Sequence, residues 1–154
     1  LRPDFSFGLN NTVSFLNFDL SAFLYGRIGQ TIRSEASGNY KIDGRENGPL
    51  VDYWTPENPT NDHPRPDKNK NQNSTYMSTL YYVDGAFVKI KNITLGYTVP
   101  AALSGKFGIG NIRVYGTLRN YFTFSGMNPY DPERGGSVSF PMTRQMIFGL
   151  NVNF

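Results

Sequence analysis

The chain contains no cysteine, which excludes disulfide bridges and thiolate metal sites. Its only histidine is His63, so neither a multi-histidine metal site nor a histidine-based catalytic triad can form within it. No run of about eighteen apolar residues occurs, which excludes a transmembrane helix. The net charge is only +3 and the basic residues are scattered, so the chain lacks a cluster of basic residues that could bind along the phosphate backbone of a nucleic acid. We therefore expect no enzyme, no cofactor, no resident metal and no nucleic-acid partner.

Aromatic residues and glycine are plentiful instead. The 154 residues include 12 Phe, 10 Tyr and 16 Gly, yet only 38% are hydrophobic. A low average hydrophobicity is typical of transmembrane β-barrels, because lipid-facing and channel-facing residues alternate and cancel in the mean. The chain starts at Leu1, and its first residues do not show the basic segment followed by an apolar segment that marks a signal peptide. We expect it to be a piece of a larger protein rather than a processed mature chain.

The end of the sequence shows the clearest pattern. Residues 144–154 alternate in polarity, and the apolar register is Met146, Phe148, Leu150, Val152 and Phe154. A β-strand sends successive side chains to opposite faces, so this segment predicts a strand with one apolar side. Such a strand would be about 36 Å long at roughly 3.3 Å per residue. A tilted strand needs about nine to eleven residues to cross a bilayer, whereas strands of globular proteins usually have about five or six.

Four further segments of similar length alternate in the same way, namely Phe5–Phe15, Phe18–Gly29, Phe87–Val99 and Asn111–Phe122. None of the positions assigned to the apolar registers holds Asp, Glu, Lys or Arg. A bilayer would enforce this segregation, because Arg or Lys on the lipid face costs about 2–4 kcal/mol at the midplane. The phase of the third segment changes near Lys91 and Asn92, which predicts either a β-bulge or a strand that leaves the bilayer at this point.

The connections between these strands alternate between short and long. Leu16–Asn17 and residues 100–110 are short, whereas 30–84 and 124–143 are long, polar and without periodicity. Outer-membrane barrels place short turns in the periplasm and longer loops outside the cell. We therefore predict an all-β fold of about five antiparallel strands from a transmembrane barrel, with two extracellular loops and a periplasmic C-terminus. A secreted β-sandwich that binds carbohydrate remains the alternative, since any half-buried antiparallel sheet segregates polarity in this way.

The chain also resembles the C-terminal end of the SusC/RagA family of TonB-linked outer-membrane transporters. The most specific segment of the resemblance is Lys91–Tyr97, which reads KNITLGY within a longer similar stretch, 84–100. Other segments that match the family are 3–5, 18–20, 54–61, 64–65, 113–115, 120–124, 130–132 and 148–154. The family usually has Asn-Leu-Phe-Thr where this chain has Asn120-Tyr-Phe-Thr, which is a conservative departure.

The resemblance implies a barrel of about 22 strands in the outer membrane of a Gram-negative cell, with residues 1–154 as its C-terminal part. It further implies an N-terminal plug and a segment that contacts the TonB complex, both outside this chain, and a SusD-like lipoprotein as a lid. The cargo would be an oligosaccharide or a peptide. The last strand, ending at Phe154, would be recognised by the barrel-assembly machinery, and Phe154 could also belong to an aromatic girdle at the membrane interface.

Candidate binding residues follow from the polar registers of the strands. Aromatic rings can stack on sugars and Arg can bind hydroxyl or carboxylate oxygens, or both can simply hydrogen-bond to the plug or to neighbouring strands. Trp54, in the first long loop, is either a platform for a sugar or an anchor that packs the loop. The strand residues that we expect to face the channel are Tyr25, Arg27, Arg113, Tyr115, Arg119 and Tyr121.

Overall fold

The structure is a computed structural model that describes residues 2–34, 40–45, 50–69, 77–127 and 130–153. The chain divides into two compact units. The sheet unit comprises Asp4–Ile28, Phe87–Ser125 and Met142–Phe154, and the loop unit comprises Leu1–Pro3, Gly29–Ala86 and Gly126–Pro141. No helix among the described residues is long and apolar enough to cross a membrane.

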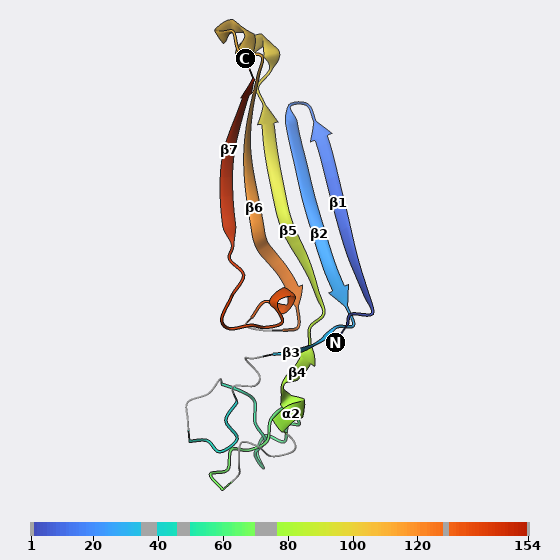
Figure 1. Cartoon of the computed structure of the whole chain (residues 1–154). Coiled ribbons are helices and arrows are strands. Elements are labelled where there is room, and N and C mark those ends of the chain that lie inside the picture. The colour runs from blue at the N-terminus through green and yellow to red at the C-terminus, as the bar shows by residue number, and fades with distance from the viewer. Residues whose placement is uncertain (1, 35–39, 46–49, 70–76, 128–129, 154) are drawn as a thin grey trace. The chain divides into compact units, whose positions relative to one another are not determined.

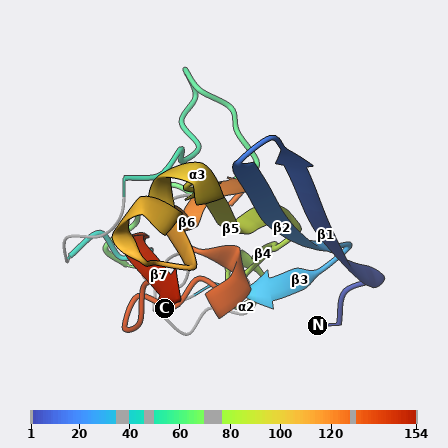
Figure 2. The same cartoon turned by 90° about the horizontal axis from the view of Figure 1, so that it is seen from above.

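The sheet unit is one antiparallel sheet of five strands in the order β1-β2-β5-β6-β7 (Figure 1). Seen from above, the five strands follow one another in a single row (Figure 2). The prediction of five long strands is confirmed, and each predicted strand agrees with an observed one to within three residues at either end. The strands are β1 (Phe5–Phe15), β2 (Phe18–Ile28), β5 (Phe87–Thr98), β6 (Asn111–Ser125) and β7 (Gln145–Asn153).

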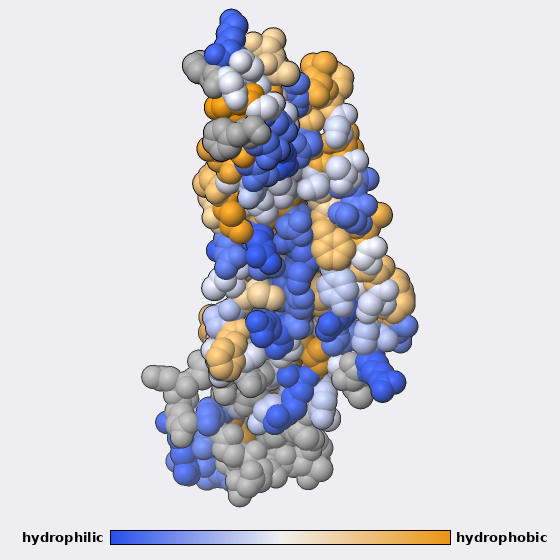
Figure 3. All heavy atoms as spheres, turned by 45° about the horizontal axis from the view of Figure 1, so that its top comes forward, coloured by the Kyte–Doolittle hydropathy of each residue, from blue (hydrophilic) through white to orange (hydrophobic). Residues whose placement is uncertain are grey.

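The register of the sheet gathers the apolar residues on one face. Leu9 pairs with Leu24 on β2, and Val114 on β6 pairs with Leu150 on β7. The intervening alternate residues form a polar face, part of which is turned toward the viewer in Figure 3. The apolar face is uncovered, since Phe148 is 83% exposed and Leu150 62% exposed. A β-sandwich would bury these side chains against a second sheet, so the sandwich alternative is wrong.

The predicted bulge in β5 is confirmed. The pairing of β5 shifts between Ile90 and Asn92 on its β6 side, and it shifts at the same place on its β2 side. On β6 the neighbouring Asn120 adopts a left-handed conformation with φ 58°, which Asn tolerates better than most residues. Because of the bulge, Val88 and Ile90 join Ile93 and Leu95 on the apolar face despite their opposite parity in the sequence.

The alternation of short and long connections is also confirmed. The two-residue turn after β1 and the connection from β5 to β6 leave the same end of the sheet, where Asn111 pairs with Asn153 near the end of β7. That second connection contains α3 (Ala101–Ser104) and the 3₁₀ helix η1 (Gly105–Phe107). Both long connections start from the opposite end, where Arg27 pairs with Phe87 and Phe87 with Ser125.

Leu16 in the β1–β2 turn has φ 54° and is 84% exposed. A left-handed backbone costs an L-residue about 1–2 kcal/mol, and glycine avoids this strain. We expect Leu16→Gly to raise the free energy of unfolding by about 0.5–1 kcal/mol, after allowing for the greater freedom of glycine in the unfolded chain. Denaturant unfolding of the full-length protein in detergent measures the change. Leu16→Ala keeps the Cβ atom, so an equal gain in that variant would contradict the strain explanation.

The loop unit contains short elements that the sequence analysis missed. Strands β3 (Thr31–Arg33) and β4 (Tyr82–Asp84) pair at the base of the first long loop, and α2 (Met77–Leu80) precedes β4. Three residues are too few for a visible alternation, so the expectation that 30–84 lacks regular structure is wrong at both ends. The loop has a small core in which Tyr40 and Ile42 pack against Val51 and Leu80.

The second long loop begins later than predicted. Strand β6 continues to Ser125, with Val88 paired to Phe124, so the predicted start of the loop at residue 124 is wrong. The loop contains the 3₁₀ helix η2 (Pro132–Arg134), where the Asp131 carboxylate accepts a hydrogen bond from the Glu133 backbone N–H. This geometry fits the turn predicted there from Pro132 and the nearby glycines.

Candidate functional site

The polar face of the sheet holds all six of the strand residues predicted to face a channel. Four of the six belong to two contact groups at opposite ends of the strands. Arg119 and Tyr121 occupy two further positions. Arg119 pairs with Asn92 and with Gln145 across the polar face, and Tyr121 precedes Phe122, whose partner Ile90 belongs to the apolar face.

The first group lies at the end of the sheet from which the long loops leave. The Arg27 Nε–H donates to the Tyr25 hydroxyl at 2.8 Å, and the Arg27 guanidinium lies 5.5 Å from the Tyr25 ring centre. The rings of Tyr25 and Phe87 meet edge to face at 5.9 Å. The ammonium groups of Lys89 and Lys91 lie 5.8 Å from the Phe87 ring and 5.9 Å from the Tyr25 ring, respectively. Cations and aromatic rings therefore interleave here across β2 and β5.

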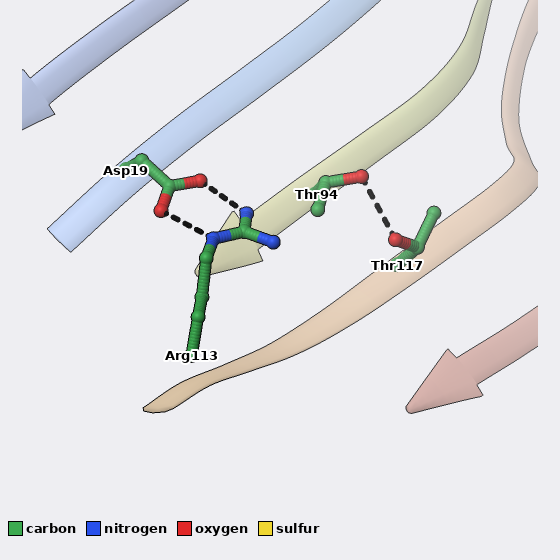
Figure 4. Close-up of polar contacts among 4 residues, drawn as sticks. All are labelled: Asp19, Thr94, Arg113 and Thr117. Atoms are coloured by element: carbon green, nitrogen blue, oxygen red, sulfur yellow. Dashed lines mark hydrogen bonds and ion pairs between the residues drawn. The ribbon is translucent and has the colours of Figure 1, made fainter. Parts of the chain in front are cut away.

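The second group lies near the turn end of the sheet and spans three strands. The Arg113 guanidinium donates to both carboxylate oxygens of Asp19, at 2.9 Å and 2.5 Å (Figure 4). Asp19 is on β2 and Arg113 on β6, so the ion pair passes over β5 at Gly96. A Cβ atom on Gly96 would overlap both charged groups. Glycine at this position is therefore what allows the two strands to be linked across a third.

Tyr115 continues this group toward β7. The Arg113 guanidinium lies 5.1 Å from the Tyr115 ring centre, and a Cβ atom on Gly149 of β7 would overlap that ring. One step along the strands, the hydroxyls of Thr94 and Thr117 hydrogen-bond at 2.8 Å (Figure 4). The polar face is thus crosslinked from β2 to β6, and Tyr115 covers the glycine on β7. Such contacts between strands stabilise the sheet and leave polar groups on its surface.

The loop unit contains a pocket of about 460 Å³ whose lining includes Trp54. Trp54 is 42% exposed, and its backbone N–H donates to the His63 carbonyl at 2.9 Å. The ring of His63 meets the Tyr40 ring edge to face at 4.9 Å. The Tyr40 hydroxyl donates to the Pro64 carbonyl at 2.5 Å. Burial, and to a smaller extent the nearby Tyr53, raises the pKa of Tyr40, which keeps this phenol protonated as a donor.

Sequence reasoning missed one partner of an ion pair, and one of its candidate residues lies outside the part of the chain that the structure describes. Asp19 is not among the residues singled out from the sequence, because its partner Arg113 is 94 residues away in sequence. Phe154, the predicted assembly signal, lies outside the described residues. Among the described residues no group of three or more His, Cys, Asp or Glu side chains is placed to hold a metal ion.

The relatives of known sequence that the chain matches are all named TonB-dependent receptors. No family model matches the chain. The chain is 30% identical to TonB-dependent receptor P3 of Formosa agariphila over 99% of its own length, which is 16% of that receptor. It is 31% identical to TonB-dependent receptor P26 of the same organism, again over 99% of the chain and 17% of the receptor. With TonB-dependent receptor SusC of Bacteroides thetaiotaomicron, it shares 36% identity over 51% of the chain and 8% of that protein.

Solved structures agree with these relatives. The chain superposes on a chain of the RagAB peptide importer in its open-open state with a TM-score of 0.73 and 25% identity, covering 99% of this chain and 17% of that one. A second RagAB structure gives a TM-score of 0.77 at 24% identity over the same shares. The chain thus spans about one sixth of the length of these relatives.

Proposed function

The chain belongs to the TonB-dependent receptors, and we propose that the whole protein imports a nutrient. The chain is a C-terminal barrel segment of such a receptor, and its five-stranded sheet is part of the wall of an outer-membrane β-barrel. The relatives are receptors and transporters rather than enzymes. The cargo that we propose is an oligosaccharide or a peptide, taken up together with a SusD-like lipoprotein lid and powered by the TonB complex.

One observation supports this proposal above all others. The sheet has an uncovered apolar face free of Asp, Glu, Lys and Arg and an opposite face with a bidentate ion pair, cations and hydroxyl contacts. A barrel wall needs this division, because one side meets hydrocarbon and the other borders the lumen. We assign the polar face to the lumen, where Tyr25, Arg27, Arg113, Tyr115, Arg119 and Tyr121 border the route of the cargo.

The connections support an orientation of the sheet in the membrane. The short turns and the end of β7 share one end of the sheet, and the long loops leave from the other. Barrels of this kind keep short turns in the periplasm, so we place the C-terminus there and the loop unit outside the cell. The last strand would then be the one that the barrel-assembly machinery recognises, with Phe154 as part of that signal.

Deletion of the gene for the full-length receptor tests the proposal. The deletion strain is grown on a panel of oligosaccharides and peptides, each as the limiting nutrient. We expect growth to fail on at least one of them and to return with the intact receptor but not with a receptor lacking its TonB-contacting segment. Equal growth of the deletion and parent strains on every nutrient would contradict a role in import.

A further inference from the structure

We propose that the pocket beside Trp54 in the loop unit is a binding site for a neutral oligosaccharide. This inference rests on the proposed import function and adds to it a substrate class and a site. The residues that line the Trp54 pocket include Trp54, Asn61, Asp62 and Arg65. Its volume of about 460 Å³ lies within the range of about 300–1,000 Å³ that is usual for ligand sites.

The pocket combines an apolar platform with polar groups that lack protein partners. The indole of Trp54 is large and partly exposed at the pocket. Within the described part of the chain, the side chains of Asn61, Asp62 and Arg65 make no hydrogen bond or ion pair. All three side chains are exposed, so a ligand in the pocket can reach their hydrogen-bonding groups.

The chemistry of the lining selects the class of ligand. The amide of Asn61 donates and accepts, the Asp62 carboxylate accepts, and the Arg65 guanidinium donates. A sugar hydroxyl also donates and accepts, and the apolar face of a sugar ring can stack on an indole. Among the described lining residues, one carboxylate (Asp62) and one guanidinium (Arg65) carry opposite charges that sum to zero, so these residues do not favour an acidic or a basic ligand. A neutral polyhydroxylated ring therefore fits the lining better than a charged peptide.

The test uses the full-length receptor purified in detergent and hexasaccharides of gluco-, manno-, xylo- and galacto-configuration as probes. Isothermal titration calorimetry measures their affinities for the intact receptor and for variants. We expect at least one hexasaccharide to bind. We also expect Trp54→Ala to weaken its binding by about tenfold, since losing about 1.4 kcal/mol of stacking corresponds to that factor. Trp54→Phe, which keeps an aromatic face, should lose less than Trp54→Ala.

Two further variants separate a pocket from a general effect on the loop. Asp62→Asn keeps the shape of the pocket and removes its anionic acceptor, so it should also weaken binding. Tyr82→Ala removes another aromatic residue of the loop unit that is 53% exposed and does not line the pocket. It should bind as the intact receptor does, and all variants should elute from size exclusion at the same volume.

The outcomes separate this inference from the import function. Unchanged affinity in Trp54→Ala and Asp62→Asn would overturn the pocket proposal and leave import untouched. Binding of acidic or neutral peptides but of no hexasaccharide would overturn it as well, while supporting a peptide importer. Failure of the import function would instead appear as normal growth of the deletion strain on every nutrient.

Discussion

Replacing Leu9 by arginine is expected to destabilise the receptor in a bilayer by about 2–4 kcal/mol, the cost of Arg on the lipid face at the midplane. Leu9 lies near the middle of β1, on the apolar face, and is 54% exposed. Nothing in the sheet unit covers it, so the new guanidinium would meet hydrocarbon. Urea unfolding of the full-length receptor in lipid vesicles measures the loss, and the amount of receptor in the outer membrane should fall with it.

Asn10→Arg is the matched control for this prediction. Asn10 is the next residue on β1 and belongs to the polar face, where it pairs with Phe23. Depth and strand are thus the same, and only the face differs. We expect its free energy of unfolding to stay within about 0.5 kcal/mol of the parent value, as for most surface substitutions. Equal losses in Leu9→Arg and Asn10→Arg would mean that the two faces do not differ in their surroundings.

The second large effect is expected at Gly96. In Gly96→Ala the new methyl group would overlap the Asp19 carboxylate and the Arg113 guanidinium. Either the ion pair is displaced or β5 must shift, and overpacking of this kind costs about 1–3 kcal/mol. Thermal or denaturant unfolding of the full-length receptor measures the change. Both charged side chains are about one quarter exposed in this chain, so the loss of the pair itself contributes only part of the cost.

Two comparisons show whether the ion pair is responsible. Gly105→Ala is a control, since a Cβ atom there meets nothing within 4 Å and its φ of −63° suits alanine. It should leave stability unchanged or raise it slightly. In an Asp19→Ala background the space above Gly96 is partly vacated, so Gly96→Ala should cost less than in the parent. The same cost in both backgrounds would contradict a role for the ion pair.

The long strands and their faces could be predicted because alternation is a local property of the sequence. Strand β1 was predicted with its observed bounds, and the change of phase at Lys91 and Asn92 was enough to predict the bulge. The pairing of Asp19 with Arg113 could not be predicted, because it depends on which strands become neighbours and on the glycine between them. The charges alone, 94 residues apart, give no sign of it.

The loop unit was harder to predict for a different reason. Strands β3 and β4 have three residues each, so neither shows a period. The Trp54 pocket brings together residue 42, residue 54, residues 60–65 and residues 79–80. Their proximity depends on the small core around Tyr40 and Ile42, which no repeat in the sequence indicates. Trp54 itself was a candidate from the sequence, because an indole in a loop can serve as a platform for a sugar or as an anchor that packs the loop.

Site-directed spin labelling along β6 tests the central claim most directly. The chain has no cysteine of its own, so once any cysteine elsewhere in the full-length receptor is replaced by serine, single cysteines can be placed in turn at positions 112–119 in liposomes. We predict that labels at Ile112, Val114, Gly116 and Leu118 collide mainly with dissolved oxygen, and that labels at the alternate positions collide mainly with a water-soluble nickel complex. A profile without this alternation, or with the two sets exchanged, would contradict the assignment of the apolar face to lipid.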